Sequence, residues 1–306
     1  MTAKFRSLCP VSSAEQVPDG LRKTIKCVCP LDCPDTCSML VTVQDGRAVE
    51  LRGDGEHPFT RGFLCQKMAR YLDRVYSPDR LMRPLRRVGA KGAGEFEPIS
   101  WDEALDEIAG RFRAIARGAH GPQAILPYSY YGTMGKLQAS SLDRRFFHLL
   151  GASKLDRTIC ASAGSLGYEY TVGAGRLGTD PMNVPQSRFI VNWGSNTVYT
   201  NSHLWSLMIE ARQAGATIVT IDPYRSATAE RSDWHIQPRP GTDAALALSL
   251  MHVIWRDGLQ DEDYLAKATI GADPLRRRVL EEYAPDRVSA ITGVDIDTIT
   301  KLAHRL

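Results

Sequence analysis

The sequence has no long hydrophobic run and no marked excess of charge of either sign. No stretch approaches the roughly 18 consecutive apolar residues of a membrane-spanning helix. The start, MTAKFRSLCPVSSAEQ, has neither an apolar signal core nor a twin-arginine pair. The 38 basic residues nearly balance the 35 acidic ones, so neither nucleic acid nor an anionic membrane is expected as a partner. These absences favour a cytoplasmic protein, or one that lacks the leader of its exported form.

Internal repeats and low-complexity segments are also absent, and the seven cysteines are an odd number. Without a secretory signal, an odd count disfavours a disulfide framework and favours metal binding or catalysis. The 306 residues, 43% of them hydrophobic, are enough for about two domains with buried cores. We therefore expect a globular protein in which several cysteines serve a site.

Local patterns in the first half predict a hairpin and a long helix. The segment SMLVTVQDGRAVELRGD alternates apolar and polar residues around Asp45-Gly46, which indicates a tight turn between two strands. Ser100 and Glu103 form a capping box ahead of a helix over 101–117, whose apolar residues recur on one face. We expect this helix to lie on the surface of its domain, with that face packed.

Beyond residue 150, apolar strands alternate with helical patterns. The runs RFIVNWG and ATIVTID predict strands at about 188–193 and 216–222, and helices ending in glycine follow each of the two strands. Strand, helix and strand in this order indicate parallel strands with covering helices. We therefore predict a doubly wound sheet in which these two strands are parallel neighbours.

Four of the cysteines lie in CVCPLDCPDTC, residues 27–37. Cys29, Cys33 and Cys37 are separated by three residues each, and Cys65 follows further along the chain. Zinc sites usually present two C-x-x-C pairs, whereas three thiolates on one loop and one remote thiolate suit the corners of an iron-sulfur cubane. The spacing favours a 4Fe-4S cluster, and zinc is the alternative.

Other interpretations of these cysteines fit less well. A radical-type cluster with three ligands needs C-x-x-x-C-x-x-C, but the second gap here is three residues. Cys27 and Cys9 fall outside the regular spacing, so we interpret them as bystanders. Pro30 and Pro34 each follow a predicted ligand and hold the loop extended, and a glycine turn precedes Cys65. This arrangement lets four sulfurs converge.

Two further motifs are interpreted as ordinary structure. VGAGRLG at 172–178 contains a formal G-x-G-x-x-G, but a nicotinamide-binding fingerprint must follow a strand and open a helix. Pro181 and Pro185 come next and would interrupt the first helical turns. The arginines of DRLMRPLRRVG lack interleaved aromatic residues, so a solvated connector is favoured over a nucleic-acid patch.

The segment CPLDCPDTCSMLVTVQDGRAVELRGDGEHPFTRGFLCQK resembles the N-terminal cluster segment of the molybdopterin oxidoreductases, the dimethyl sulfoxide reductase superfamily. The resemblance continues through ISWDEALDEIA, TICASAG, NWGSN, TIVTIDP and RPGTDAALAL in the family's order, and so covers about residues 25–306. It implies a molybdenum or tungsten bis-molybdopterin guanine dinucleotide cofactor beside the 4Fe-4S cluster. The implied activity is an oxidoreduction in which electrons pass between metal-bound substrate and the cluster.

With this resemblance, the expected fold is α/β: a small β-rich iron-sulfur domain and then α/β domains with a Rossmann-like doubly wound parallel sheet, incomplete relative to the family. The expected divisions are an N-terminal tail at 1–22, a 4Fe-4S domain at 23–82, the first part of an α/β domain at 83–152, and a Rossmann-like pterin-dinucleotide-binding domain at 153–306.

The resemblance also implies roles for single residues. Cys160, in TICASAGSLGY, matches the family position that binds molybdenum or tungsten, and its ordinary alternative is a buried core thiol. Lys67 matches a lysine between cluster and pterin, and its alternative is a solvated surface lysine. We predict that Cys160 faces a cavity shared by Asn196, Asp222 and Gly241, with Lys67 between that cavity and the cluster.

Segments that follow two predicted strands and open a later helix match the family's contacts to the dinucleotide. A pyrophosphate is held by backbone amides at strand ends and helix starts, and the carboxylate of Asp222 can accept hydrogen bonds from the guanine N1 and amino group. Turn and capping chemistry is the ordinary alternative for each position. The matching residues are Gly194, Ser195, Asn196, Asp222, Pro223, Gly241, Thr242 and Asp243.

Family members are considerably longer, so we expect a fragment, a truncated reading frame or one piece of a split enzyme. The competing classes are an iron-sulfur electron-transfer subunit without metal catalysis, similar to the large subunit of respiratory complex I, and an inactive remnant.

Family formate dehydrogenases carry histidine after the metal ligand, but Ala161 stands here. Formate is therefore less expected than thiosulfate, polysulfide, sulfoxide or nitrate. The expected partners are a small-molecule or oxyanion substrate and a ferredoxin-like iron-sulfur subunit, without nucleic acid or a membrane span.

Overall fold

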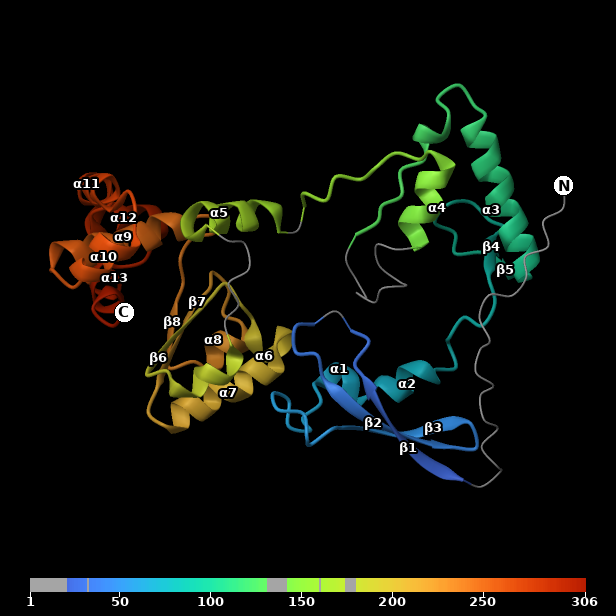
Figure 1. Cartoon of the computed structure of the whole chain (residues 1–306), viewed down its shortest axis with the longest axis horizontal. Helices are drawn as coiled ribbons and strands as arrows, with labels where there is room; N and C mark the ends of the chain where they lie inside the picture. The colour runs from blue at the N-terminus through green and yellow to red at the C-terminus, as the bar shows by residue number, and fades with distance from the viewer. Residues whose placement is uncertain (1–20, 32, 131–141, 160, 174–179) are drawn as a thin grey trace. The chain divides into compact units, whose positions relative to one another are not determined.

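The structure is a computed structural model that describes residues 21–31, 33–130, 142–159, 161–173 and 180–306 (Figure 1). Two compact units divide the chain, one up to Gly178 and the other from Thr179. Each unit is described by itself below. The domain limits predicted near residues 22, 82 and 152 stay predictions.

The first unit begins with an antiparallel sheet of three strands in the order β1-β2-β3. These are β1 (Arg22–Val28), β2 (Ser38–Gln44) and β3 (Arg47–Gly53). At the β2–β3 turn Asp45 and Gly46 have φ values of 51° and 73°. Two successive positive φ values are the signature of a type I′ turn, whose twist matches that of paired strands. The predicted hairpin is therefore confirmed, whereas β1 was not predicted.

Two short helices, α1 (Gln66–Ala69) and α2 (Tyr71–Val75), follow the sheet. Tyr76, at the end of α2, ties this segment to β3. Its hydroxyl accepts a hydrogen bond from the Ala48 backbone N–H at 2.8 Å, and the Arg47 guanidinium lies 3.6 Å from its ring centroid. The path of the chain after Cys65 is thus fixed against the sheet that carries the other cysteines.

The rest of the first unit contains the predicted capped helix. A hairpin of β4 (Leu85–Arg87) and β5 (Phe96–Pro98) leads into α3 (Trp101–Ala116). Both hydrogen bonds of the Ser100–Glu103 capping box are present. The 3-10 helix η1 (Pro122–Ala124), α4 (Leu142–Leu150) and α5 (Ser162–Val172) complete the described part of this unit.

The apolar face of α3 is more exposed than we predicted. Trp101 is 67% exposed and Leu105 58%, whereas Phe112 further along has ring contacts with Phe146 and Phe147 of α4. Helical periodicity shows that a helix has an apolar face but does not specify which element covers it. Among the described residues, α4 covers only part of this face.

The second unit is built around three parallel strands in the order β6-β7-β8. They are β6 (Phe189–Trp193), β7 (Thr217–Ile221) and β8 (Trp234–Ile236). The parallel pairing of β6 with β7 confirms the prediction. The intervening elements are the 3-10 helix η2 (Pro181–Gln186), α6 (Thr197–Thr200), α7 (Ser202–Gln213) and α8 (Ala227–Arg231).

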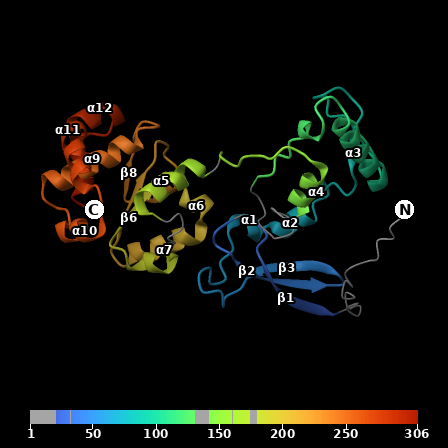
Figure 2. The same cartoon turned by 45° about the horizontal axis from the view of Figure 1, so that its top comes forward.

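Helices cover both faces of this sheet (Figure 2). On one face, Val219 and Ile221 of β7 pack in a core with residues of α9 and α13. Ile218 and Thr220 alternate with them along the strand and are fully buried on the other face. The helices α7 and α8 contact β7 on that face. Alternate side chains of a strand point to opposite faces. The helices after β8 are α9 (Asp243–Arg256), α10 (Glu262–Ala268), α11 (Ala272–Glu282), α12 (Pro285–Thr292) and α13 (Ile296–Ala303).

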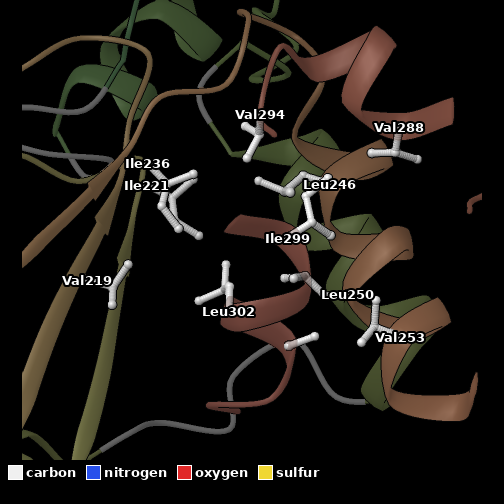
Figure 3. Packing of buried hydrophobic residues seen from close by; sticks show 11 residues of the cluster. Val219, Ile221, Ile236, Leu246, Leu250, Val253, Val288, Val294, Ile299 and Leu302 are labelled. Atoms are coloured by element: carbon white, nitrogen blue, oxygen red, sulfur yellow. The ribbon is translucent and has the colours of Figure 1, made fainter. Parts of the chain in front are cut away.

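The core of the second unit joins the sheet to these later helices (Figure 3). Leu246 of α9 and Ile299 of α13 are fully buried there. Leu246→Ala is expected to lower the free energy of unfolding by about 2–5 kcal/mol, because lost burial and a residual cavity add. Met251, on the same helix but 39% exposed, is the matched control. Denaturant unfolding should show a much smaller effect for Met251→Ala, and equal losses would contradict this description of the core.

The elements around the G-x-G-x-x-G motif are helical, although residues 174–178 of the motif lie outside the described residues. The helix α5 ends at Val172, and η2, a 3-10 helix, begins at Pro181. The described flanks therefore lack the strand before and the α-helix after that a nicotinamide fingerprint requires. Within the described part of the chain, the helices are too short or too polar to span a membrane.

Candidate functional site

The predicted cluster loop is closed by the strands that flank it. Val28 at the end of β1 pairs with Ser38 at the start of β2, and the Cys29 backbone N–H donates to the Cys37 carbonyl at 2.9 Å. Cys29 and Cys37 therefore lie opposite each other at the base of the loop, and Cys33 lies in the loop between them. Cys65 is the residue immediately before α1.

Electrostatic interactions place the four predicted ligands in one group. Cys37 is buried, and burial is the main reason that its pKa rises to about 12. The neighbouring groups Cys29, Asp35, Cys33 and Cys65 raise it further. The pKa of Cys33 is also raised, first by burial, and Cys65 is among the groups that raise it. Cys37 is thus close enough to the other three thiols for their charges to affect its pKa, and Cys33 is close enough to Cys65.

Cys27 differs from this group. It lies within β1, where it pairs with Met39 of β2. Burial raises the pKa of its thiol, and Cys29 is the one further group that contributes among the described residues. Cys27 thus interacts with Cys29 but is not among the groups that affect the pKa of Cys33 or Cys37, which does not test which residues bind iron. Cys9 lies outside the described residues.

The predicted cluster ligands, Cys29, Cys33, Cys37 and Cys65, are all thiols. In the described ranges, no three His, Cys, Asp or Glu side chains are arranged around one metal ion. A cubane places each thiolate on a different iron, so its ligands need not converge on one point. Soft thiolates are the ligands that iron-sulfur clusters take. Burial raises the pKa of Cys37 to about 12, so this thiol would have to lose its proton in order to bind iron.

A second layer of contacts supports the loop. The buried Asp54 carboxylate accepts a hydrogen bond from Ser38 at 2.8 Å and lies 2.6 Å from the Lys26 ammonium. The hydrogen bond from Lys26 is the main cause that lowers the pKa of Asp54 to about 2, with Ser38 next. Asp54 thus links β1 with the residue after Cys37. Sequence reasoning missed it because its partners are distant in the chain.

Gly53 and Gly62 bring the segment before Cys65 against the sheet. A Cβ on Gly53 would overlap the Gly62 carbonyl oxygen, whereas a Cβ on Gly55 would meet nothing within 4 Å. Gly53→Ala is therefore expected to push these segments apart, destabilise the first unit by about 1–3 kcal/mol and lower its iron content. Gly55→Ala is the matched control. Equal iron content in both variants would show that the close approach is not needed.

Lys67 lies on α1 with its side chain exposed. The next residue, Met68, is 1% exposed and anchors the helix in the first unit. The helix therefore presents Lys67 to solvent only two residues after Cys65. This position is compatible with the predicted role between cluster and pterin, which stays a prediction.

In the second unit, two of the predicted segments lie at one edge of the sheet. The Gly194 backbone N–H donates to the Ile221 carbonyl at 2.8 Å, and the Asp222 N–H donates to the Ile236 carbonyl at 3.0 Å. The loops after β6 and β7 therefore start side by side at the carboxyl ends of parallel strands. Open α/β sheets bind ligands at this edge.

The third predicted segment joins them through a tryptophan. Gly241 has a φ of 79° at the turn into α9, and Thr242 donates to the Arg239 carbonyl at 2.7 Å. The Trp193 indole N–H donates to Asp243 Oδ1 at 2.7 Å. Because Trp193 is the last residue of β6, this bond brings the start of α9 beside the same edge.

Two residues of the β8 segment, which sequence reasoning missed, hold the Asp222–Pro223 turn. His235 Nε2 lies 2.8 Å from the Asp222 carbonyl oxygen, and Gln237 Nε2 donates to the Pro223 carbonyl at 2.7 Å. Asp222 Oδ1 accepts from the Tyr224 backbone N–H at 2.8 Å. One carboxylate oxygen is thus used by the turn, and Oδ2 is the oxygen that could accept from a ligand.

A cavity of about 290 Å³ lies in the first unit beside α4. Its lining includes the cationic or titratable groups Arg144, His148, Lys154 and Arg157, and one carboxylate, Asp143. Arg157 donates to the Ser129 hydroxyl at 2.7 Å. The excess of basic groups suits an anionic ligand.

The predicted metal ligand, Cys160, lies outside the described residues. Its predicted cavity with Asn196, Asp222 and Gly241 is therefore not tested, and neither is the position of Lys67 between that cavity and the cluster. The cysteine group lies in the first unit and the strand-end group in the second.

Comparison with protein families gives two matches that together cover most of the chain. The family described as molybdopterin oxidoreductase matches residues 80–291. The molybdopterin oxidoreductase Fe4S4 domain matches residues 22–77. The second match contains the four predicted cluster cysteines, and the first contains Cys160 and the strand-end residues.

Curated relatives and a solved structure agree with these matches. A probable oxidoreductase of Bacillus subtilis, YoaE, is 46% identical over 91% of this chain and 40% of its own length. A nitrate reductase of Symbiobacterium thermophilum is 33% identical over 90% of this chain and 37% of its own length. The acetylene hydratase of Pelobacter acetylenicus superposes with a TM-score of 0.70 and 30% identity, over 92% of this chain and 38% of that one. The chain spans about two fifths of the length of these proteins.

Proposed function

This chain belongs to the molybdopterin oxidoreductase family, and from that premise we propose that it forms the N-terminal part of a molybdenum or tungsten bis-pterin oxidoreductase. Its role is to hold a 4Fe-4S cluster and part of the dinucleotide site, so that electrons pass between metal-bound substrate and the cluster. The observation that carries this proposal is the grouping of four thiols, from a closed loop and from the start of α1, inside the Fe4S4 match.

In this proposal Cys29, Cys33, Cys37 and Cys65 bind the cluster. Burial of Cys37 and the tight base of the loop keep water away from at least one thiolate, and a dry, partly hydrophobic shell tunes the potential of a metal centre. Lys67 is proposed to lie between the cluster and the pterin, where its positive charge would stabilise an electron on either group.

The dinucleotide is proposed to lie along the carboxyl edge of the β6–β7–β8 sheet. The backbone amides of the loop after β6 and of the turn into α9 would donate to pyrophosphate oxygens. Asp222 Oδ2 would accept from the guanine N1 and amino group, because Oδ1 is already bonded to the turn. The proposed contacts are Gly194, Ser195, Asn196, Asp222, Pro223, Gly241, Thr242 and Asp243.

Cys160 is proposed as the protein's direct ligand to molybdenum or tungsten. When bound, the metal supplies reversible oxidation-state changes and an open position for substrate. A thiolate suits such a metal because it is a soft, electron-rich donor.

The substrate is proposed to be a small molecule or an oxyanion, and the cationic cavity beside α4 supports an anionic ligand. We propose a ferredoxin-like iron-sulfur subunit as the electron partner. A cytoplasmic location stays a prediction from the sequence.

Metal and pterin content of the longest natural form, purified without oxygen, tests this function. The expected result is about four irons per chain, together with molybdenum or tungsten and a guanine-containing pterin. Iron without pterin or the heavier metal would instead identify an electron-transfer subunit of the same fold. Absence of all three would identify an inactive remnant.

A further inference from the structure

A set of hydrogen bonds, each with a defined donor and acceptor, joins the loop after β6 to Thr228 of α8. The Val198 backbone N–H donates to Thr228 Oγ1 at 3.0 Å. Because a backbone N–H can only donate, the Thr228 hydroxyl hydrogen is left to point elsewhere, and Asn196 Oδ1 lies 2.9 Å from the same hydroxyl. In the structure the Thr228 hydroxyl donates to Asn196 Oδ1, which uses the hydroxyl hydrogen that Val198 leaves available, and the Asn196 NH2 group therefore points away from Thr228.

A second branch holds the same loop from the sheet side. Asn192 Nδ2 donates to the Ser195 carbonyl at 2.6 Å, and Asn192 Oδ1 accepts from the Thr197 hydroxyl at 2.6 Å. A carbonyl can only accept, so the orientation of this amide is also determined. The Thr197 hydrogen is used in this bond, so the Ser195 hydroxyl, 3.1 Å away, is the donor to Thr197.

A third branch anchors Thr228 itself. The Ser232 hydroxyl donates to the Thr228 carbonyl at 2.8 Å, and Thr220 lies 2.6 Å from Ser232. Thr220 and Thr228 are both fully buried. Buried hydroxyls that are fully bonded in this way rigidify the groups they join, and an unmade bond among them is costly.

We infer that Thr228 is a positioning residue for the dinucleotide site, because it holds the Asn196 amide oxygen and leaves both amide hydrogens directed away from Thr228 and available to a bound ligand. Asn196 is only partly buried, and its Nδ2 has no hydrogen-bond partner among the described residues. The group that it recognises must be an acceptor, and charged pyrophosphate oxygens are the strongest acceptors in a nucleoside diphosphate. This inference rests on the proposed function.

The test uses the longest natural form, produced in a host that makes no pterin cofactor, with GDP as the probe in titration calorimetry. Thr228→Val keeps the volume of the side chain but removes the hydroxyl. It should weaken GDP binding about tenfold or more, since a hydrogen bond to a charged group is lost. Thr228→Ser should restore binding to near the unsubstituted value.

Two further variants separate positioning from stability. Thr292→Val removes a fully buried hydroxyl that lies outside this set and bonds Val288 and Val294, so it should lower the unfolding temperature but leave GDP affinity within about twofold. Asn196→Asp still accepts from Thr228 but has no amide hydrogens, and it should bind GDP as poorly as Thr228→Val. This variant keeps the inference testable if Thr228→Val does not fold.

The outcomes distinguish the inference from the function on which it rests. If the unsubstituted protein binds GDP and Thr228→Val or Asn196→Asp binds it equally well, the inference is wrong and the proposed function is untouched. Equal weakening by Thr292→Val would also overturn it, because the effect would then be one of general stability. If the unsubstituted protein neither binds GDP nor carries a pterin dinucleotide when made in a competent host, both fail.

Discussion

Cys33→Ser is expected to remove the iron-sulfur cluster, whereas Cys27→Ser is expected to leave it in place. Cys33 lies in the loop between the two thiols at its base, and its electrostatic neighbours include Cys65. Cys27 lies within β1, and Cys29 is the thiol that affects its pKa. Serine removes the soft donor but keeps the size of the side chain, so each change tests ligation rather than packing.

The measurement is iron per chain with the visible absorbance of the cluster, after anaerobic purification. The Cys27→Ser protein should retain about four irons, and the Cys33→Ser protein should lose most of them. Both variants should keep the fold of the second unit, which contains neither cysteine. A comparable loss of iron in Cys27→Ser would show that the four-cysteine assignment is wrong.

Cys160→Ser is expected to abolish or strongly alter turnover in the longest natural form while leaving the cluster absorbance unchanged. The reason is chemical: a serine oxygen is a harder donor than a thiolate and changes the electron density at the metal. The proposed cluster ligands are separate residues, so cluster assembly should not depend on this one.

Activity with an artificial electron donor, measured beside iron and molybdenum or tungsten content, checks this prediction. Oxyanions and sulfoxides are suitable first substrates, because the class of substrate is still open. Loss of the cluster in Cys160→Ser would show a structural role for this cysteine. Unchanged turnover with unchanged metal content would remove it from the metal site.

The parts of the fold that sequence reasoning predicted have local causes. The Asp45-Gly46 turn, the Ser100–Glu103 capping box and the parallel strands beyond residue 150 are all present. Each depends on the preferences of a few adjacent residues or on a short apolar run. The strand β1 was missed because nearly all of its residues are exposed, so it lacks the alternation of a half-buried strand.

In the candidate site, too, the features with local causes were predicted from the sequence and those with distant partners were missed. Cysteine spacing and strand ends are visible in the sequence, and the structure groups the four thiols and brings the strand-end segments to one edge. Asp54, His235 and Thr228 have partners far away in the chain or in a neighbouring element, so no local pattern marks them. The order of the strands in the sheet determines which polar side chains contact a given loop. That order depends on tertiary packing and not on a local sequence pattern.

A redox titration followed by electron paramagnetic resonance tests the central claim most directly, because it reports the cluster and the metal in one sample. The protein is the longest natural form, purified without oxygen and poised at successive potentials. Our account predicts a signal from a reduced 4Fe-4S cluster and a separate signal from pentavalent molybdenum or tungsten in the same preparation. A cluster signal at every low potential, with no signal from either metal at any potential and no pterin in the sample, would contradict it.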